Sequence, residues 1–368
     1  MPQKMTSEEL KTEMFGAPIE PNNIHHNNLI DILKQTLGIV EFKSFIGHHP
    51  VALNRERLDL LLNEDYLVCE KSDGIRVMLL LSGQFTYLYD RTNKFHMTCI
   101  NTRTKAPFLF DGEMYRTKDT FVFAIFDVLI FDGKSVLKRN LIERLSLCQS
   151  FANTFRSSHR DSALIKFKIV FKTFIKSYAF KSILDAISSF DHKNDGLIFT
   201  PVSDPYALYA ISRILKWKPP HLNTIDFKIR PIFPKLFGLF CTICPEQFRL
   251  FVKGANCPTE IELGRYFLTE GDFQNSGESF SNIRERLSDG SIGEFGFDSE
   301  KEVLEEDGTF SKGGWVLHRI REDKLDPNNV KIAIEQIESL ADEVGEAELV
   351  ANGPEMQRNF KSRQNKSP

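Results

Sequence analysis

Long apolar runs are missing from this sequence of 368 residues. A membrane-spanning helix needs about 18 consecutive apolar residues, and the longest apolar run, 121–131, is interrupted by Asp127. The first ten residues include Glu8 and Glu9 and lack the apolar core of a secretory signal peptide. We therefore expect no membrane contact, and a buried strand at 121–131.

Cysteine is also scarce, with six residues in the chain. Cys241 and Cys244 form a single C-x-x-C pair, and a structural zinc site would need a second pair that Cys257 alone does not supply. The pattern favours reduced thiols in a cytosolic or nuclear protein.

No charge of one sign dominates, since the formal net charge is −3 and the isoelectric point is about 6.3. A protein that coats duplex DNA through charge alone would be more basic. We expect any nucleic-acid contact to be local, at a groove or a strand end. Phenylalanine is abundant, with 32 residues, which predicts an aromatic-rich core.

The chain is long enough for two domains. Residues 1–23 are expected to be flexible and 24–229 to form the first domain, with antiparallel strands over 66–131. Helical spacing is found after a cap at Asn54, at 140–155 and at 178–190. Short strands predict a second β domain over 230–326. A helix is expected over 327–350, capped by Asp326, followed by a disordered tail at 351–368.

The first chemical motif is Glu70-Lys71-Ser72-Asp73-Gly74-Ile75-Arg76. An apolar strand leads directly into Lys71, and an Asp-Gly turn follows it. A lysine held beside a tight turn is a candidate nucleophile once it is deprotonated. The alternative is a surface hairpin whose lysine has no function.

Two further motifs place acids beside glycine and an apolar strand. Asp111 and Glu113 flank a glycine within 108–115, where carboxylates could bind a ribose or a metal, and Asp195 precedes the apolar strand 197–199. Carboxylate oxygens are suitable ligands for a divalent metal. The alternative for each motif is an ordinary turn.

Two cationic motifs suit phosphate groups. Lys216 and Lys218 share one face of a predicted strand while Trp217 occupies the other, and Arg319 and Arg321 share a later strand face. The alternative for Lys216 and Lys218 is a pair of exposed surface lysines with buried stems. The alternative for Arg319 and Arg321 is a ladder of ion pairs on an edge strand.

Together and in this order, the motifs resemble those of the covalent nucleotidyltransferase superfamily, which comprises capping guanylyltransferases and ATP- or NAD-dependent ligases. The segments 50–53, 66–76, 216–227 and 319–324 are most similar to the capping guanylyltransferases of cellular eukaryotes. One departure is Tyr209-Ala210, where many relatives have a Gly-Thr pair.

The resemblance implies a role for each matching residue. Lys71 would attack the α-phosphorus of GTP and hold GMP as a phosphoramidate. Phe126 would stack on guanine, and Asp195 would help to hold Mg²⁺ or Mn²⁺. The other implied GTP-binding residues are Arg76, Arg91 and Glu113 at the ribose, Lys216 and Lys218 at the α-phosphate, Asp226, and Arg319, Arg321, Asp323 and Lys324 at the β- and γ-phosphates.

The resemblance also implies an α+β fold: a nucleotidyltransferase domain of ATP-grasp-like antiparallel sheets, as in DNA ligases and capping enzymes, followed by a C-terminal OB-fold barrel. GMP would pass to a 5′-diphosphate RNA. About 40 residues precede the recognisable region, too few for a second catalytic domain, so we expect a separate RNA triphosphatase. A nuclear location and recruitment by the phosphorylated C-terminal tail of RNA polymerase II are also implied.

Two rival functions remain. The first is an ATP-dependent nucleic-acid ligase, which would use the same lysine chemistry. The second is a catalytically inactive protein that binds RNA ends, although such a protein need not retain Lys71, Glu113 and Arg319 together.

Overall fold

The computed structural model describes residues 15, 18–21, 23–42, 45–98, 100, 102–158, 167–219, 222–232, 235–236, 239–240, 247–255, 259–268, 286–304, 309–322 and 324–365. The chain forms two compact units. The first unit comprises Met1–Trp217 and Glu346–Pro368, and the second comprises Lys218–Gly345. Among the described residues, no helix has both the length and the apolar character needed to cross a membrane.

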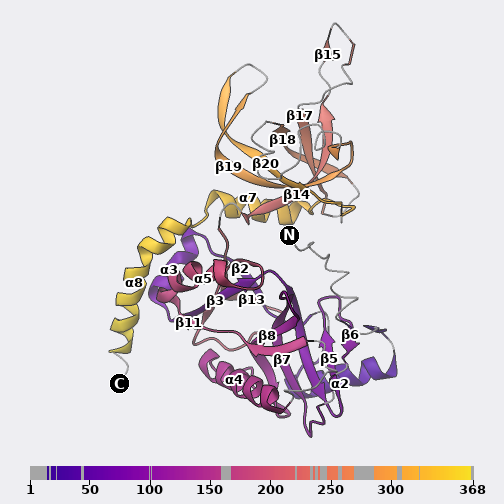
Figure 1. Ribbon diagram of the computed structural model, residues 1–368, viewed down its shortest axis with the longest axis vertical. Coiled ribbons are helices and arrows are strands. Elements are labelled where there is room, and N and C mark those ends of the chain that lie inside the picture. Colours follow the sequence, from indigo (N-terminus) through magenta and orange to yellow (C-terminus); the bar gives the residue numbers. More distant parts are fainter. Residues whose placement is uncertain are drawn as a thin grey trace. The chain divides into compact units, whose positions relative to one another are not determined.

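An eight-stranded sheet is the larger of two sheets in the first unit (Figure 1). Its strands are β1 (Pro18–Ile19), β4 (Ile75–Ser82), β5 (Phe85–Tyr89), β6 (Phe95–Met97), β7 (Phe108–Arg116), β8 (Phe121–Phe131), β9 (Lys134–Ser135) and β10 (Phe167–Phe171). The order is β1-β6-β5-β4-β7-β8-β10, with β9 paired to β8, and only the β8–β10 pairing is parallel.

Helices cover both faces of this sheet. On one face Val77 and Leu79 share a core with Cys148 of α4 (Leu141–Ser158), and on the other Met78 and Leu80 pack with Leu33 of α2 (Ile24–Leu37). Burial on both faces explains why β4 reads as an unbroken apolar run instead of an alternating one.

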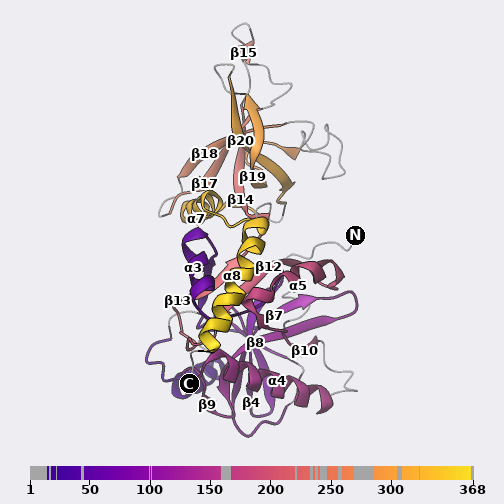
Figure 2. The same cartoon turned by 90° about the vertical axis from the view of Figure 1, so that its left-hand side faces the viewer.

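A five-stranded sheet completes the first unit, in the order β11-β3-β12-β13-β2. Its strands are β2 (His49–Ala52), β3 (Tyr66–Ser72), β11 (Ile175–Lys176), β12 (Asn194–Pro201) and β13 (Ile211–Trp217). The last helix, α8 (Glu346–Gln364), runs beside α3 (Arg55–Asn63) in both views (Figures 1 and 2). Arg363 donates to Asp65 at 2.7 Å and to the carbonyl of Leu62 at 3.1 Å. Residues at the two ends of the chain thus build one unit.

An antiparallel sheet forms the second unit, in the order β18-β17-β14-β19-β20. Its strands are β14 (Thr224–Ile232), β17 (Gln247–Lys253), β18 (Glu260–Phe267), β19 (Ile292–Leu304) and β20 (Phe310–Ile320); a short β15–β16 pair (Lys235–Leu236 and Leu239–Phe240) and α7 (Val330–Ala341) accompany them. Trp315 of β20 lies over Gly264 of β18, where an added Cβ would be 2.8 Å from the indole nitrogen. Among the described residues the backbone pairings leave the sheet open, so the expected closed barrel is not found; the two edge strands meet through this side-chain contact.

The α+β class and the helices after Asn54 and over 140–155 are confirmed. The helix expected over 178–190 is broken into α5 (Lys181–Ala186) between two 3-10 turns. The helix expected over 327–350 is divided between α7 and α8. α7 begins after Asn329, whose side chain accepts from the Lys331 amide at 3.0 Å, so the predicted cap at Asp326 is wrong.

Two predicted boundaries are also wrong. The units divide after Trp217 and not after residue 229, because β14 is the central strand of the second sheet. Residues 351–364 are helical and not disordered, since α8 packs on α3. The C-x-x-C pair, Cys257 and most of the expected flexible segment 1–23 lie outside the described residues.

Candidate active site

Lys71 forms an ion pair with Asp195 at the end of strand β3. Its Nζ lies 2.6 Å from the Asp195 Oδ1, and both side chains are partly exposed. The register between β12 and β3 explains the contact. Asn194 pairs with Ser72 and Leu197 with Glu70, so β12 has one residue more than β3 across this interval. This β-bulge directs Asp195 toward Lys71, and Gly196 supplies the φ of 141° that the bulge requires.

The Asp73–Gly74 turn holds Lys71 against the larger sheet. A Cβ on Gly74 would lie 2.5 Å from the carbonyl oxygen of Met114, so only glycine allows this approach. The Asp73 amide also donates to the Lys193 carbonyl at 2.9 Å. These contacts fix the strand end that presents the candidate nucleophile.

Lys216 lies on the same face of the smaller sheet as Lys71. Cys69 and Lys216 both pair with Ile198, and Lys71 is two residues from Cys69. Trp217 is buried on the opposite face, as the alternation predicts. The sequence pattern therefore places two of the predicted phosphate-contacting amines on one surface.

Glu113 of β7 faces this surface and is surrounded by cations. Burial raises the pKa of Glu113 to about 7, while the charges of Lys172, Lys71, Arg76 and Arg91 act in the opposite direction. Burial therefore favours the protonated carboxyl group, which can donate as well as accept a hydrogen bond. Such a group beside several cations suits a polar, anionic ligand.

Arg76 is paired with Asp111 in the interior of the first unit. Its Nε and Nη2 donate to the two carboxylate oxygens at 3.0 and 2.6 Å, and Nη1 donates to the His48 carbonyl at 2.6 Å. The Tyr206 hydroxyl donates to the same carboxylate. Burial, followed by the charge of Arg76, lowers the pKa of His48 to about 3, so this imidazole is neutral. Arg76 therefore stabilises the interior of the first unit through Asp111 and the His48 carbonyl.

Phe126 is presented by a second bulge. Asp111 pairs with Asp127 and Gly112 with Ile125, so Phe126 is the additional residue of β8. Its ring lies 5.5 Å from the Arg76 guanidinium carbon and is only partly buried. The neighbouring Asp127 points into the core, where Arg144 holds it at 2.8 Å. The bulge thus gives adjacent residues of one strand different environments.

Lys172 is a site residue that the sequence motifs did not reveal. This buried lysine bonds the Glu70 carbonyl at 2.9 Å and the Glu70 carboxylate at 3.0 Å, while its amide donates to Ile125 at 2.9 Å. It thereby joins the two sheets next to Lys71. Burial opposes the charged form, but Cys69, Glu70 and Glu113 raise the pKa of Lys172 overall. The signal in the sequence was an apolar strand leading into a lysine, as at Lys71.

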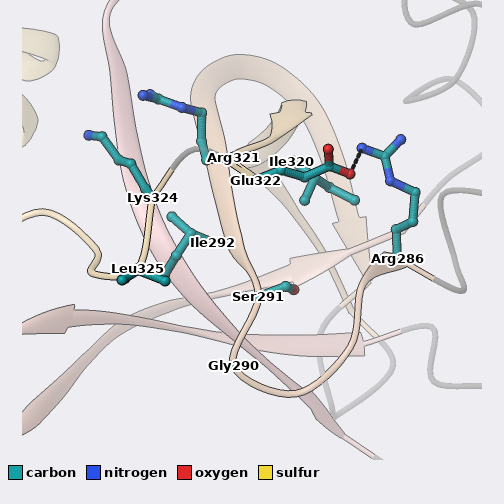
Figure 3. Close-up of a pocket in the computed structure, with 9 residues that line it drawn as sticks. All are labelled: Arg286, Gly290, Ser291, Ile292, Ile320, Arg321, Glu322, Lys324 and Leu325. Carbon is teal, nitrogen blue, oxygen red and sulfur yellow. Dashed lines mark hydrogen bonds and ion pairs between the residues drawn. The ribbon is translucent and has the colours of Figure 1, made fainter. Parts of the chain in front are cut away.

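The remaining predicted cations lie in the second unit, which begins at Lys218. Arg321 and Lys324 both bind the Asp226 carboxylate, Arg321 at 3.1 Å, and Arg319 binds Glu294 at 2.5 Å. Arg321 and Lys324 point to one side of a pocket of about 280 Å³, whereas Glu322 and Arg286 form an ion pair on the other side (Figure 3). Asp323 lies outside the described residues. These basic groups are already arranged around acids within their own unit.

Family models match almost the whole described chain. The catalytic domain of the mRNA capping enzyme matches residues 17–220, and the mRNA capping enzyme C-terminal domain matches residues 222–350. The chain belongs to the mRNA capping enzyme family. The boundary between the two family matches falls close to the division between the two structural units.

Several relatives of this capping enzyme family are similar over most of their length. The mRNA-capping enzyme subunit alpha of Neurospora crassa is 28% identical, covering 88% of this chain and 87% of its own. The protein of the same name from Saccharomyces cerevisiae is 25% identical, covering 90% and 83%. A solved structure of mycobacterial DNA ligase D complexed with ATP and MES shows 14% identity and a TM-score of 0.39, over 76% of this chain and 94% of that one. A score this low does not support a functional comparison.

A capping enzyme of this family also acts on nucleotides with a divalent metal, and the residues at Lys71 fit such an ion. Mg²⁺ is usually held by one or two carboxylates together with the phosphates of a substrate. Asp195 is a partly exposed carboxylate that forms an ion pair with Lys71. Among the described residues, no group of three acids, histidines or cysteines is placed to hold a metal ion.

Proposed function

We propose that this chain is an mRNA guanylyltransferase that uses Lys71 as its nucleophile. The observation that supports this best is the 2.6 Å contact between Lys71 and Asp195, opposite a Glu113 that is surrounded by cations. This arrangement lies within the segment that matches the capping-enzyme catalytic domain. It supplies a nucleophile, cations for phosphate oxygens and a carboxylate for a metal, which are the requirements of phosphoryl-group transfer.

The proposed reaction has two steps. In the first, the neutral Lys71 amine attacks the α-phosphorus of GTP, a P–N bond forms, and the bond from the α-phosphorus to the bridging oxygen breaks to release pyrophosphate. In the second, a terminal oxygen of a 5′-diphosphate RNA attacks the same phosphorus. The P–N bond then breaks, Lys71 regains its proton, and GMP is left on the RNA as a GpppN cap.

The chain's own residues would position these groups. Lys216 lies on the Lys71 face and would neutralise the α-phosphate, and Glu113 would bond the ribose hydroxyls. Phe126, directed out of its strand by the bulge, would stack on guanine. A divalent ion, Mg²⁺ or Mn²⁺, would be held by Asp195 and would neutralise charge on the phosphate oxygens.

The second unit would supply the remaining phosphate contacts. Arg321 and Lys324 bind Asp226 in the described structure, and we propose that the β- and γ-phosphates of GTP exchange with that carboxylate. Arg319, Lys218 and Asp323 are assigned to the same nucleotide. We further propose a nuclear enzyme that depends on a separate RNA triphosphatase and is recruited by the phosphorylated tail of RNA polymerase II.

Labelling with radioactive nucleotide tests the proposal. The purified protein is incubated with GTP or ATP labelled at the α-phosphate and with Mg²⁺ or Mn²⁺, and then run on a denaturing gel beside Lys71→Ala. We expect label from GTP alone, absent from the variant, in an adduct that is stable to base and labile to acid. Label from ATP would instead favour a ligase. No label from either nucleotide, with folded protein, would favour an RNA-end-binding protein without catalysis.

A further inference from the structure

A row of three arginines crosses the outer face of the second unit. Arg230 of β14 pairs with Arg249 of β17, and Arg249 pairs with Arg265 of β18, so the three side chains lie on one face of adjacent strands. The residues that alternate with them, including Phe248 and Tyr266, fill the core of the unit. Arg230 and Arg249 have 42% and 47% of their side chains exposed, and Arg265 is also exposed.

An aromatic ring lies within this row. The guanidinium carbons of Arg230 and Arg249 are 5.3 and 5.7 Å from the centre of the Phe251 ring. At these distances the ring attracts both cations. Arginines held in this way present flat surfaces to bases and donors to phosphates.

The surroundings leave an excess of positive charge. Lys228 and Lys253 lie on the same face of these strands, and β18 places the carboxylates of Glu260 and Glu262 beside the row. Lys253 is also paired with Asp326 at 3.0 Å. Glu260 bonds Lys228 at 2.7 Å and Arg230 at 2.5 Å, while Glu262 is 3.9 Å from Arg249. Among the described residues of these three strands, five cations therefore share this face with three acids, the third being Asp226.

Like charges directly opposite each other on neighbouring strands destabilise a sheet. The register Arg230–Arg249–Arg265 creates this situation twice. A polyanion bound along the row would relieve the repulsion, which is a physical reason to expect a ligand there.

The row is continuous with the proposed phosphate-binding residues. Asp226, Lys228 and Arg230 alternate on one face of β14, and Asp226 is the residue that Arg321 and Lys324 bind. Arg230 lies four positions after Asp226 along β14, a distance of about 13 Å. A basic track thus leads from the proposed phosphate contacts across β14, β17 and β18.

We propose that this arginine row binds the single-stranded acceptor RNA downstream of its 5′ end. The inference rests on the proposed guanylyltransferase function, because that function makes RNA the second substrate. Phosphates would contact the guanidinium groups, and bases would stack on the guanidinium groups beside Phe251. An acidic or phosphorylated peptide is the other polyanion that such a row could attract, and it is an outcome of the test.

The test uses the full chain with Arg249→Gln and Arg265→Gln together. The matched control is Lys312→Gln, which removes an exposed cation of β20 elsewhere in the same unit. Binding is measured with a 5′-diphosphate RNA of about 16 nucleotides over a range of salt concentrations. GMP transfer is measured to this RNA and to a 5′-diphosphate dinucleotide too short to reach the row.

For the double variant we expect RNA affinity to fall roughly tenfold and the slope of log affinity against log salt to become shallower by about 1.4, since each lost contact to a single strand contributes about 0.7. The KM for the longer RNA should rise, with lysyl-GMP formation and transfer to the dinucleotide unchanged. The control should behave as the wild type does. The melting temperature should be unchanged or higher, because repulsion within the row is removed.

Wild-type RNA affinity and salt slope in the double variant would overturn the inference. So would an unchanged RNA affinity accompanied by loss of binding to a phosphoserine peptide, which would assign the row to a peptide. If the double variant unfolds, Arg249→Lys with Arg265→Lys keeps the charge and must retain the salt slope. The guanylyltransferase proposal is tested separately, because it fails if the wild-type chain forms no lysyl-GMP. RNA binding by the arginine row can still be measured in that case.

Discussion

Replacing Arg76 with methionine should destabilise the first unit severely. Arg76 has only 7% of its side chain exposed, and its partner Asp111 is fully buried. The substitution leaves a buried carboxylate with one remaining hydroxyl donor, from Tyr206, and leaves the His48 carbonyl without the Arg76 donor. Breaking a buried ion pair on one side costs about 3–5 kcal/mol. This is a large part of the stability of an ordinary domain, which is about 5–15 kcal/mol.

Urea unfolding followed by tryptophan fluorescence measures this cost. The chain has two tryptophans, and Trp217 is buried in the first unit. Substituting Trp315→Phe in every protein of the series leaves Trp217 as the reporter of the first unit. The control is Lys181→Ala, which removes an exposed pair with Asp185 and should change the unfolding free energy by less than about 0.5 kcal/mol.

The double variant Arg76→Met with Asp111→Leu tests why Arg76→Met lowers the free energy of unfolding. If the cost comes from the carboxylate left uncompensated, apolar replacement of both partners should recover most of the lost stability. Unchanged stability in the single variant, with only a raised KM for GTP, would show that Arg76 is mainly a ligand contact and would refute the reasoning. No recovery in the double variant would also refute it.

Three further predictions concern the site and its support. Burial raises the pKa of Glu113 to about 7 from its usual 4.5, so the folded state binds a proton that the unfolded state has already lost, and this residue lowers stability as pH rises from 4.5 to 7. Glu113→Gln should remove that decline and raise the free energy of unfolding, measured in urea at pH 8, by up to about 3 kcal/mol. Gly74→Ala should lower the rate of lysyl-GMP formation at least tenfold, because its Cβ would meet the Met114 carbonyl oxygen at 2.5 Å and displace Lys71; a wild-type rate would contradict this. Met356→Ala should cost about 2–5 kcal/mol in the first unit, because Met356 of α8 is buried, and an unchanged unfolding midpoint would show that α8 contributes little.

The sequence suggested candidate residues for the site but not the contacts that support them. Lys71, Lys216 and Glu113 were identified because apolar strands lead into them and because the strand period assigns faces. The bulge that directs Asp195 depends on pairing between β3 and β12, which are far apart in the chain, and nothing local specifies that pairing. The bulge at Phe126 lies between the consecutive strands β7 and β8, but the apolar run of β8 does not show where the extra residue falls.

Long-range ion pairs were missed for the same reason. Lys172 and Glu70 are 102 residues apart, so neither reveals the other in the sequence. Residues 351–368 were expected to be disordered because their composition is polar, and Pro354 also argues against an independent helix. Its order comes from contacts with α3, which composition does not report.

The return of α8 to α3 has a consequence for how the chain folds as it is synthesised. Asp65 leaves the ribosome early, but its partner Arg363 follows 298 residues later, after the entire second unit. Domains usually fold as they emerge, at about 5–20 residues per second, so the second unit can reach its native state while the first still lacks a helix. For that interval the side of α3 that α8 covers is open to chaperones. The candidate nucleophile lies on β3, the strand that follows α3, so the unit that holds it is completed only when α8 has been synthesised.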